Sequence, residues 1–389
     1  MHYYFKKQQL FRKNTAYSRS HLPKIIRYLR LHKTMRFTIH SFYSCFLCIL
    51  CWTAPNSVFS QAMLVQPPNA APSQGRINRH HYFPSTFITA RNVDVWLPSD
   101  YDPNKKYGVI YMHDGQNLFD GNSTWNHQEW GIDESVTAHN SSTHSNNKNQ
   151  SDTSKSSFSE FNEYIVVGIW NDGVNRHSNY FPQKVYESLT AKEKAAIMEA
   201  KRQNQSDVFH NPINSDDYLK FIVYELRPFI NKTYSTYTDP SHTVIGGSSM
   251  GGLISMYAIC EYPGVFGTAA CFSTHWPGIF EMKNNPIPDA MVRYFKKNLP
   301  NPINHKFLFT HGTEGLDALY GTTQKRIDKI MSNSGYKRHI KNQPLFLGSN
   351  WKTQVDQGLG HEEATWQQQF RENIEFLLYV NYYVIDAIH

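Results

Sequence analysis

Apolar and polar positions alternate with two different periods along most of this chain. From about residue 79 onward, short apolar runs of strand length alternate with longer stretches of helical periodicity. The runs at 164–170 and 306–312 are almost continuously apolar, which is typical of strands buried on both faces of a sheet. The predicted strands are 91–98, 107–112, 164–170, 242–247, 266–273, 306–312 and 351–356. This order predicts an α/β fold with a mainly parallel sheet covered by helices, the last of them near 363–380.

Two polar segments interrupt this alternation. Residues 138–160 have low complexity and almost no apolar side chains, which predicts a solvated loop or a disordered insertion. Residues 183–212 contain a charged helix in which Thr190 and Glu193 have the spacing of a capping box. That segment has two open interpretations, a lid over a substrate cleft and a solvated surface helix.

The charge of the chain is unevenly distributed. The sequence contains 39 Lys and Arg residues against 32 Asp and Glu residues, a formal net charge of +7. Ten of the basic residues and none of the acidic residues fall within residues 1–60, so residues 61–389 carry 29 basic and 32 acidic residues. The sequence therefore gives no electrostatic reason to expect a nucleic-acid partner.

An apolar run within the N-terminal segment points to export. Residues 42–53 are uncharged and apolar, but the run is too short to span a bilayer as a helix. It follows Arg36 and precedes Val58 and Ser60, which are residues of the size that a signal peptidase site accepts. The pattern predicts a secretory signal peptide, with an uncleaved signal anchor as the alternative.

This signal divides the chain into three predicted parts. Residues 1–60 form a basic extension and signal peptide, residues 61–82 form an N-terminal linker, and residues 83–389 form the main domain. Met35 is a natural start for the signal peptide, so residues 1–34 are either a basic extension or an upstream mis-start. We predict a secreted or periplasmic product without stable membrane insertion after signal cleavage; its oligomeric state stays open.

The five cysteines fall into two groups. Cys45, Cys48 and Cys51 lie in the apolar run and would leave with the signal peptide. Cys260 and Cys271 remain, and a disulfide between them would need Cα atoms within about 7 Å. A helix and the strand that follows it need not supply that distance, so we predict two buried thiols.

The strongest chemical signal is the sequence GSSMG at residues 247–251, which fits the G-x-S-x-G pattern. A β-branched run at residues 243–245 precedes it, and an apolar helical pattern follows it directly. Strand, nucleophile and helix in this order form the nucleophile elbow of an α/β-hydrolase. The pattern predicts Ser249 as the nucleophile rather than Ser248, and both glycines are expected because side chains there would collide with neighbouring elements.

A nucleophilic serine needs a general base and a group that orients the base. In this fold both partners follow the nucleophile in the chain. His361 is best placed, in a glycine-flanked loop between the last predicted strand and the terminal helix. The competing histidines are His275, His305, His311, His339 and His389. For the acid, Glu314 and Asp317 both follow the strand at 306–312, and the residues alone leave them nearly equal.

The oxyanion hole of this fold combines two backbone amides. One comes from Met250, after the nucleophile, and the other from Gln116, in the loop after the strand at 107–112. His113 and Asp114 could instead form a metal pair, but no third ligand lies at a sensible spacing. We therefore predict neither a metal nor another cofactor.

Six segments carry a family resemblance in a fixed order. They are RNVDVWLPSDYDPNKKYGVIYMHDGQNLFD, VVGIWNDGVNRHSNYFP, GGSSMGGLISMYA, FSTHWPG, HGTEGLDALYG and GHEEATW. From about Phe83 to the C-terminus, the chain resembles the "Putative esterase" family of α/β-hydrolases, which contains enterochelin and feruloyl esterases. The resemblance implies an α/β-hydrolase fold, with helices on both faces of the sheet, and a Ser/His/acid esterase without a cofactor. It also favours Asp317 over Glu314, because LD-x-x-Y is the family-like part of that segment, whereas the polar insertion at 138–160 departs from the family pattern.

Loops at the same edge of the predicted sheet carry candidate substrate-binding residues. These are Trp170, Arg176, His275 and Trp276. An aromatic cleft suits a small-molecule ester with an aryl, siderophore or glycan group, although aromatic side chains are equally ordinary core material.

These observations predict a secreted serine esterase that hydrolyses a carboxylic ester. Ser249 would form an acyl-enzyme, with His361 as the base and Asp317 as the orienting acid. An acyltransferase of the mycolyltransferase type is one alternative, because it uses the same elbow and passes the acyl group to another acceptor. A non-catalytic binding protein is a second alternative of a different class.

Overall fold

The computed structural model describes residues 64–65, 71–124, 126–148, 159–160, 162–280, 282–340, 344–345 and 348–381. The extension and signal peptide predicted for residues 1–60 lie outside this range. No helix within the described ranges is long and apolar enough to cross a membrane. The elements below all belong to the unit Val58–His389.

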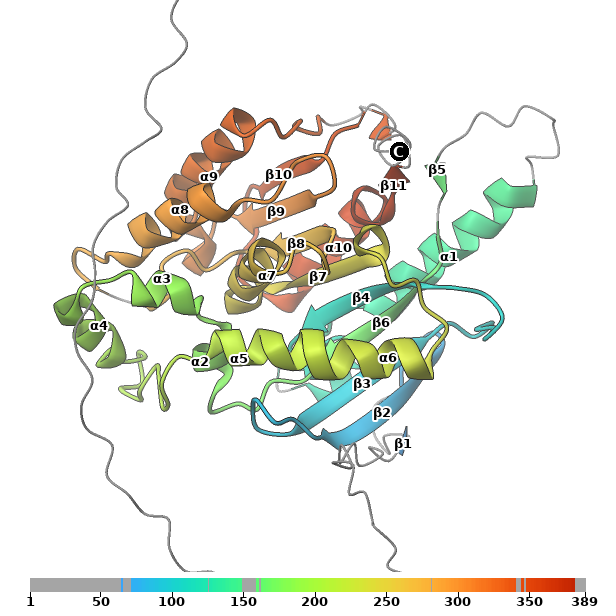
Figure 1. The fold of residues 1–389 in the computed structure, drawn as a ribbon, viewed down its shortest axis with the longest axis horizontal. Coiled ribbons are helices and arrows are strands. Elements are labelled where there is room, and N and C mark those ends of the chain that lie inside the picture. The colour runs from blue at the N-terminus through green and yellow to red at the C-terminus, as the bar shows by residue number, and fades with distance from the viewer. Residues whose placement is uncertain are drawn as a thin grey trace, which may run out of the picture. The chain divides into compact units, whose positions relative to one another are not determined.

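A nine-stranded sheet forms the centre of the described part of this unit (Figure 1). Its strand order is β1-β2-β3-β6-β4-β7-β8-β9-β10. The strands are β1 (Leu64–Val65), β2 (Arg76–Phe83), β3 (Arg91–Leu97), β4 (Gly108–His113), β6 (Tyr164–Ile169), β7 (Thr243–Ser248), β8 (Thr268–Phe272), β9 (Lys306–Gly312) and β10 (Trp351–Asp356). From β6 to β10 all neighbours are parallel, whereas β1, β2 and β3 join antiparallel. The short strands β5 (Ser159–Glu160) and β11 (Val380–Asn381) pair separately.

All seven predicted strands are confirmed, with ends within two residues of the predicted ones. The mainly parallel sheet and its helical layers confirm the predicted α/β-hydrolase fold class. Because the parallel strands share one direction, the loops after β4, β6, β7, β8, β9 and β10 all emerge at one edge of the sheet. Every predicted site residue lies in or beside one of those loops.

The helices separate into two layers, one on each face of the sheet. The helices are α1 (Ile132–Lys148), α2 (Arg176–Tyr180), α3 (Gln183–Glu187), α4 (Ala191–Met198), α5 (Ser215–Lys220), α6 (Arg227–Thr233), α7 (Met250–Glu261), α8 (Ile287–Asn298), α9 (Gly321–Asn333) and α10 (Glu363–Leu378). A π-helical turn, η3 (Phe221–Leu226), continues α5 into α6, and short 3₁₀ turns are η1 (Gly115–Asn117), η2 (Gly121–Ser123), η4 (Pro240–His242) and η5 (Gly315–Leu319). In Figure 1, α5 and α6 cross one face of the sheet.

Alternate side chains of the central strand β4 pack against the helices on opposite faces of the sheet. Val109 and Tyr111 pack in the core beneath α5, α6, α7, α8 and α9, whereas Ile110 and Met112 pack in the core beneath α1 and α10. This division follows from the two-residue period of a strand. A strand buried on both faces carries apolar residues on both, which is why the runs at β6 and β9 are almost continuously apolar.

The last part of the predicted linker at residues 61–82 belongs to the sheet, because residues 76–82 lie in β2, which pairs with β3. Few apolar residues mark this strand, although Ile77 and Phe83 are buried. Its anchor is polar: Arg79 donates Nε and Nη2 to the two carboxylate oxygens of Asp94 on β3, at 2.6 and 2.8 Å. An ion pair of this kind has no periodic signature in the sequence.

The predicted loop at residues 138–160 is corrected in its first half, because α1 continues to Lys148. One face of this polar helix is buried through hydrogen bonds rather than apolar packing. Asn140 donates Nδ2 to the Tyr164 carbonyl at 3.1 Å and accepts the Tyr164 amide at 3.0 Å, which completes the start of β6. His139 contacts Glu375 on α10 at 3.3 Å. Residues 149–158 lie outside the described ranges.

The segment at residues 183–212 contains two short helices, α3 and α4, rather than one. The capping box at the start of α4 is confirmed: the Thr190 hydroxyl accepts from the Glu193 amide, and the Glu193 carboxylate accepts from the Thr190 amide. Its role as a lid stays a prediction.

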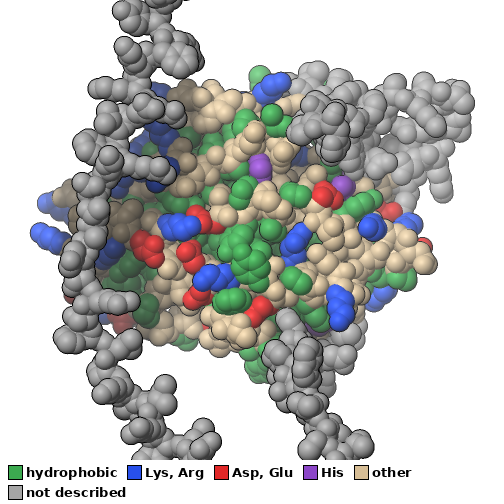
Figure 2. All heavy atoms as spheres, viewed as in Figure 1, with side chains coloured by type: hydrophobic (Ala, Val, Ile, Leu, Met, Phe, Trp, Pro, Cys, Tyr) green, Lys and Arg blue, Asp and Glu red, His purple; other side chains and the backbone are tan. Residues whose placement is uncertain are grey.

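The face of the molecule drawn in Figure 2 carries Lys and Arg side chains close to Asp and Glu side chains. Mixed charges of this kind produce no extended field of one sign. The two remaining cysteines, Cys260 on α7 and Cys271 on β8, are buried free thiols. Burial raises the pKa of both thiols, which keeps them protonated.

Candidate active site

The candidate nucleophile lies at the turn between β7 and α7. Ser249 has φ 59° and ψ −119°, a conformation that residues other than glycine rarely adopt. Backbone hydrogen bonds hold the turn, since the Ser249 amide donates to the Phe272 carbonyl at 2.9 Å and the His275 amide donates to the Ser249 carbonyl at 3.2 Å. The side chain is only partly buried. The elbow therefore presents this hydroxyl at the sheet edge where the other predicted residues gather.

The two glycines of the pattern have unequal roles. A Cβ atom at Gly247 would lie 3.1 Å from the His113 Cβ and 3.2 Å from the Gly251 Cα, so a larger residue would force a shift. A Cβ atom at Gly251 would come no closer than 3.4 Å to a neighbour, which is ordinary contact. The predicted collision holds at Gly247 and not at Gly251.

The candidate base and acid are in direct contact. The His361 Nδ1 donates to the Asp317 Oδ1 at 2.6 Å. The other carboxylate oxygen accepts from the Ser273 hydroxyl at 2.6 Å and from the Gly312 amide at 2.7 Å. Burial alone would raise the pKa of Asp317, but these three hydrogen bonds and the facing imidazole together lower it. Asp317 is thus a fully buried carboxylate that stays ionised and accepts the imidazole hydrogen.

The competing acid and bases have other surroundings. Glu314 is exposed at the start of η5, while Asp317 is buried within it. His305 and His311 contact backbone carbonyls, and His339 contacts the Ser349 hydroxyl. His389 lies outside the described residues.

The predicted oxyanion loop forms the tight turn η1 directly after β4. Asp114 begins the turn in the left-handed region at φ 58°. A Cβ atom at Gly115 would lie 2.4 Å from the Gly168 carbonyl carbon of β6, so this position accepts only glycine. Gln116 follows inside the turn, and Met250 is the first residue of α7, where a helix leaves its amide without an intrahelical partner.

A charged pair holds this loop from the side. Arg176, at the start of α2, donates Nε and Nη2 to the two carboxylate oxygens of Asp114, at 2.8 and 2.7 Å. Asn171 donates its side-chain Nδ2 to the same carboxylate at 2.7 Å. The backbone amide of Asn171 donates to the Gln116 side-chain Oε1 at 3.3 Å. Burial would raise the pKa of Asp114, but Arg176 and Asn171 hold it below its usual value. Two residues of the oxyanion loop are therefore tied to the loop after β6.

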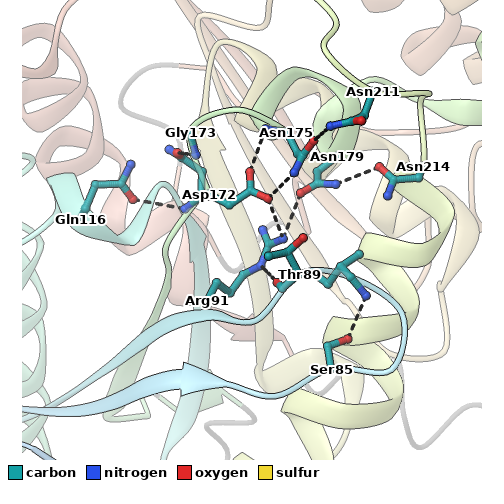
Figure 3. A network of polar contacts seen from close by, with 12 residues as sticks. Ser85, Thr89, Arg91, Gln116, Asp172, Gly173, Asn175, Asn179, Asn211 and Asn214 are labelled. Carbon is teal, nitrogen blue, oxygen red and sulfur yellow. Dashed lines mark hydrogen bonds and ion pairs between the residues drawn. The ribbon is translucent and has the colours of Figure 1, made fainter.

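A second polar network fixes that loop in turn (Figure 3). Buried Arg91 donates Nη2 to the Asn179 Oδ1 at 3.0 Å and lies 3.8 Å from the Asp172 carboxylate. Asn175 donates Nδ2 to the Asp172 Oδ2 at 2.7 Å. Asn179 donates onward to Asn214 before α5, at 2.8 Å. The support for Gln116 thus extends from β3 to α5.

The four predicted substrate-binding residues differ in how far they are exposed. Trp276 is 1% exposed and donates Nε1 to Gln324, so it is a core residue and the prediction that it lines a cleft is not supported. Trp170 is half-buried and donates Nε1 to the Asp94 carboxylate at 2.8 Å. Arg176 lies beside the oxyanion loop, and its side chain is 28% exposed.

The fourth of them, His275, is buried, and its Nδ1 lies 2.9 Å from the Tyr320 hydroxyl. Burial, together with the neighbouring His177 and His361, keeps the pKa of His275 well below its usual value. The imidazole is therefore neutral.

The alternative metal pair has its polar atoms engaged elsewhere. The His113 Nδ1 lies 2.8 Å from the Tyr218 hydroxyl, and Asp114 pairs with Arg176. Burial lowers the pKa of His113 to about 3, so its ring is neutral. In the described ranges, no three His, Cys, Asp or Glu side chains gather in a way that could hold a metal ion.

Sequence reasoning missed three residues that contact the candidate site. Asn171 lies in the WNDG turn. Ser273 follows β8 directly, with φ 41°, and its hydroxyl also accepts from Trp366 Nε1 at 2.9 Å. Tyr320 follows η5, and its hydroxyl lies 3.5 Å from the His361 Nδ1. The sequence marks Asn171 and Ser273 only as polar residues just after a strand, and such residues also occur in ordinary turns.

The strand order, the strained serine after β7 and the carboxylate–imidazole pair after β9 and β10 define the α/β-hydrolase class of protein. The family model named "Putative esterase" matches residues 85–377, which is most of the chain. The chain therefore belongs to this esterase family.

Individual relatives are distant. Over 198 residues the chain is 23% identical to the uncharacterized protein YjcH of Bacillus subtilis (strain 168), covering 51% of this chain and only 61% of that relative. The structure of the BES protein from Bacillus cereus is similar with a TM-score of 0.52 and 14% identity, covering 82% of this chain and 100% of that one. An IroE-like serine hydrolase from Shewanella oneidensis is similar with a TM-score of 0.52 and 16% identity, covering 78% and 80%. These likenesses show a shared fold.

Proposed function

We propose that this protein is a serine esterase that hydrolyses a carboxylic ester through an acyl-enzyme. The single observation that carries the proposal is the 2.6 Å contact between Asp317 and His361, at the same sheet edge as the strained Ser249. A buried carboxylate on Nδ1 leaves Nε2 of a neutral imidazole free to accept a proton. Family membership supports the same reaction class.

In the proposed reaction, the Ser249 oxygen attacks the ester carbonyl carbon while its proton passes to the His361 Nε2. The carbonyl π electrons move to the oxygen, which the amides of Gln116 and Met250 stabilise. The tetrahedral intermediate collapses, the bond to the alcohol breaks, and His361 returns the proton to the leaving oxygen. Water repeats the sequence on the acyl-enzyme, releasing the acid and regenerating the serine.

The proposed substrate is a small-molecule ester with an aryl, siderophore or glycan group, and the proposed location is outside the cytoplasm. The location rests on the signal peptide predicted within residues 1–60. Initial rates on feruloyl, acetyl-xylan, siderophore and short acyl esters, measured with the protein beginning after residue 60, would rank these substrate classes.

The decisive test is turnover of p-nitrophenyl acetate by wild type and by Ser249→Ala. We expect a loss of about a thousandfold or more in kcat, because no second group can form the acyl-enzyme. Ser248→Ala is the matched control, since the neighbouring serine is buried at the end of β7, and it should keep activity within a few fold. Retained activity in Ser249→Ala would disprove the proposal.

A further inference from the structure

The Ser273 hydroxyl connects the candidate acid to an indole on α10. It donates to the Asp317 Oδ2 at 2.6 Å and accepts from the Trp366 Nε1 at 2.9 Å. Ser273 and Asp317 are 0% exposed, and Trp366 is 6% exposed. Hydrogen bonds in such surroundings are electrostatically stronger than in water. Two further side chains therefore hold the acid, through the carboxylate oxygen that does not face His361.

The chemistry of these groups allows only one direction for the hydrogens. An indole Nε1 only donates, and an ionised carboxylate only accepts. The Ser273 hydroxyl has a single hydrogen, so its oxygen receives the Trp366 hydrogen while its own hydrogen goes to Asp317. The other oxygen of Asp317 accepts from the His361 Nδ1 at 2.6 Å. Donors from the loop after β8 and the loop after β10 thus converge on one carboxylate.

The backbone of Ser273 is fixed in an unusual conformation. Its φ of 41° lies in the left-handed region, where a residue other than glycine is strained. Its amide donates to the Thr310 carbonyl of β9 at 2.7 Å. The strained residue is therefore bonded to the strand that leads into the Asp317 loop, and its side chain points to the acid.

The Trp366 ring also contacts the candidate base. The ring centroids of Trp366 and His361 lie 5.0 Å apart, with the ring planes at 90°. A second indole, Trp130, packs against Trp366 with its centroid 5.5 Å away. Trp366 lies in the first turn of α10, directly after the loop that carries His361. One side chain thus touches the imidazole directly and reaches its carboxylate partner through Ser273.

We infer that Ser273 and Trp366 are positioning residues for the proposed base: Ser273 fixes the orientation of the Asp317 carboxylate, and Trp366 fixes the Ser273 hydroxyl. A carboxylate without the Ser273 bond would keep only the Gly312 amide on its Oδ2, so it could rotate away from the His361 Nδ1. Neither positioning residue exchanges a proton in the reaction, because both act through Asp317. The inference rests on the proposed esterase function and adds two residues to it.

The primary test is hydrolysis of p-nitrophenyl acetate by Ser273→Ala. We expect kcat to fall about tenfold to a hundredfold, as for loss of a hydrogen bond to a charged group, with KM within about twofold of wild type. The rate of labelling by a fluorophosphonate probe should fall in parallel, because labelling needs the same base. An unchanged kcat, or a change confined to KM, would overturn the inference.

Trp366→Phe tests the second positioning residue, since it removes the donor and keeps an aromatic ring. Its kcat should fall about threefold to tenfold, less than in Ser273→Ala, because the Ser273 hydroxyl can still reach Asp317. A value equal to wild type would remove Trp366 from the inference and overturn it in its stated form.

The chain provides a matched control for this indole. Trp351 is 3% exposed at the start of β10, the end of that strand away from the site, and donates Nε1 to the Thr353 hydroxyl at 3.0 Å. Thr353 donates in turn to the Asp328 carboxylate at 2.7 Å. The same three kinds of group are thus connected in the same order outside the proposed triad. Trp351→Phe should stay within about twofold of wild type in kcat, and a loss equal to that of Trp366→Phe would overturn the inference.

The double variant separates positioning from stability. Ser273→Ala leaves the Trp366 Nε1 without its acceptor, which also lowers stability. Adding Trp366→Phe removes that unsatisfied donor, so the midpoint of urea unfolding should return toward wild type. We expect kcat to stay within about twofold of Ser273→Ala, because Trp366 acts through Ser273. Recovery of kcat along with stability would mean a purely structural role, and losses that multiply would mean that Trp366 acts independently; either result would overturn the inference.

Ser249→Ala distinguishes this inference from the proposed function. If Ser249→Ala is inactive while Ser273→Ala matches wild type, only the positioning role fails. If Ser249→Ala keeps its activity, the proposed function fails, and the positioning role fails with it.

Discussion

The two sides of the candidate active site are held by different physical means. On the oxyanion side, formed by the loops after β4 and β6, a charged pair and a wide network of amides hold a strained turn. On the base side, formed by the loops after β9 and β10, one carboxylate accepts three hydrogen bonds inside the protein. The first arrangement fixes backbone amides, and the second fixes one imidazole.

The difference indicates how each side tolerates change. Asp317 and His361 form one short hydrogen-bonded pair, so under the proposed mechanism we expect a single substitution on the base side to abolish activity while most of the packing remains. Gln116 is supported by many residues, from Asp114 through Asn171 to Arg91, so a substitution on the oxyanion side displaces the amide only partly. We therefore expect substitutions on the base side to lower activity more than stability, and substitutions on the oxyanion side to lower stability more than activity.

The largest effect is expected from Asp317→Asn. The amide cannot hold the His361 tautomer that presents a free Nε2, so kcat should fall about a hundredfold to ten-thousandfold. Glu314→Gln, an exposed carboxylate in the same loop, is the control and should stay within about twofold of wild type. Steady-state hydrolysis of p-nitrophenyl acetate measures both. The opposite ranking would assign the acid to Glu314.

A smaller loss of activity with a larger loss of stability is expected from Arg176→Met. Removing the guanidinium leaves the Asp114 carboxylate, 10% exposed, without its charge partner. Because Arg176 is itself partly exposed, the free energy of unfolding should fall by roughly 2–3 kcal/mol, less than for a fully buried pair. We expect kcat to fall about tenfold to a hundredfold as the oxyanion loop relaxes.

A double-variant cycle checks the cause. Asp114→Asn combined with Arg176→Met should regain much of the stability, measured by urea unfolding, because no unpaired charge remains. If the double variant is no more stable than Arg176→Met alone, the pair is not what holds the loop.

The smallest effect of a single substitution concerns the pH dependence of stability, to which two buried histidines on the oxyanion side contribute. Burial lowers the pKa of His113 and of His177 to about 3, against about 6.5 in an unfolded chain. Between these values the unfolded state binds more protons, so stability is lost as pH falls below about 6.5. Each ring contributes up to about 1.4 kcal/mol per pH unit. His177→Gln should flatten the slope of urea unfolding between pH 6.5 and 5, and an unchanged slope would contradict it.

The sequence predicted those parts of the fold and site whose signal is local. Seven strands and the elbow at Ser249 follow from apolar runs and one short motif. The choice of Asp317 over Glu314 required a family resemblance, because burial within η5 cannot be read from two carboxylates three residues apart. Trp276 resembled a cleft residue by position, but its ring packs in the core.

Long-range polar contacts were not predictable in the same way. The strand β2 depends on Arg79 meeting Asp94, and the polar half of α1 depends on Asn140 meeting the backbone of Tyr164. Neither contact leaves a periodic trace, because each is made between segments far apart in the chain. Such contacts account for a strand where a linker was predicted and for the end of a helix where a loop was predicted.

The backbone conformation of Ser249 has a consequence for how this protein can change over generations. At φ 59° a glycine would fit with less strain than the serine that is present, and strain of this kind costs about 1–3 kcal/mol. Selection for a more robust fold alone would thus drive this position toward glycine. Under the proposed mechanism the hydroxyl is retained there only while it acts as the nucleophile. If that role were lost, replacement by glycine would give a more stable but inactive protein.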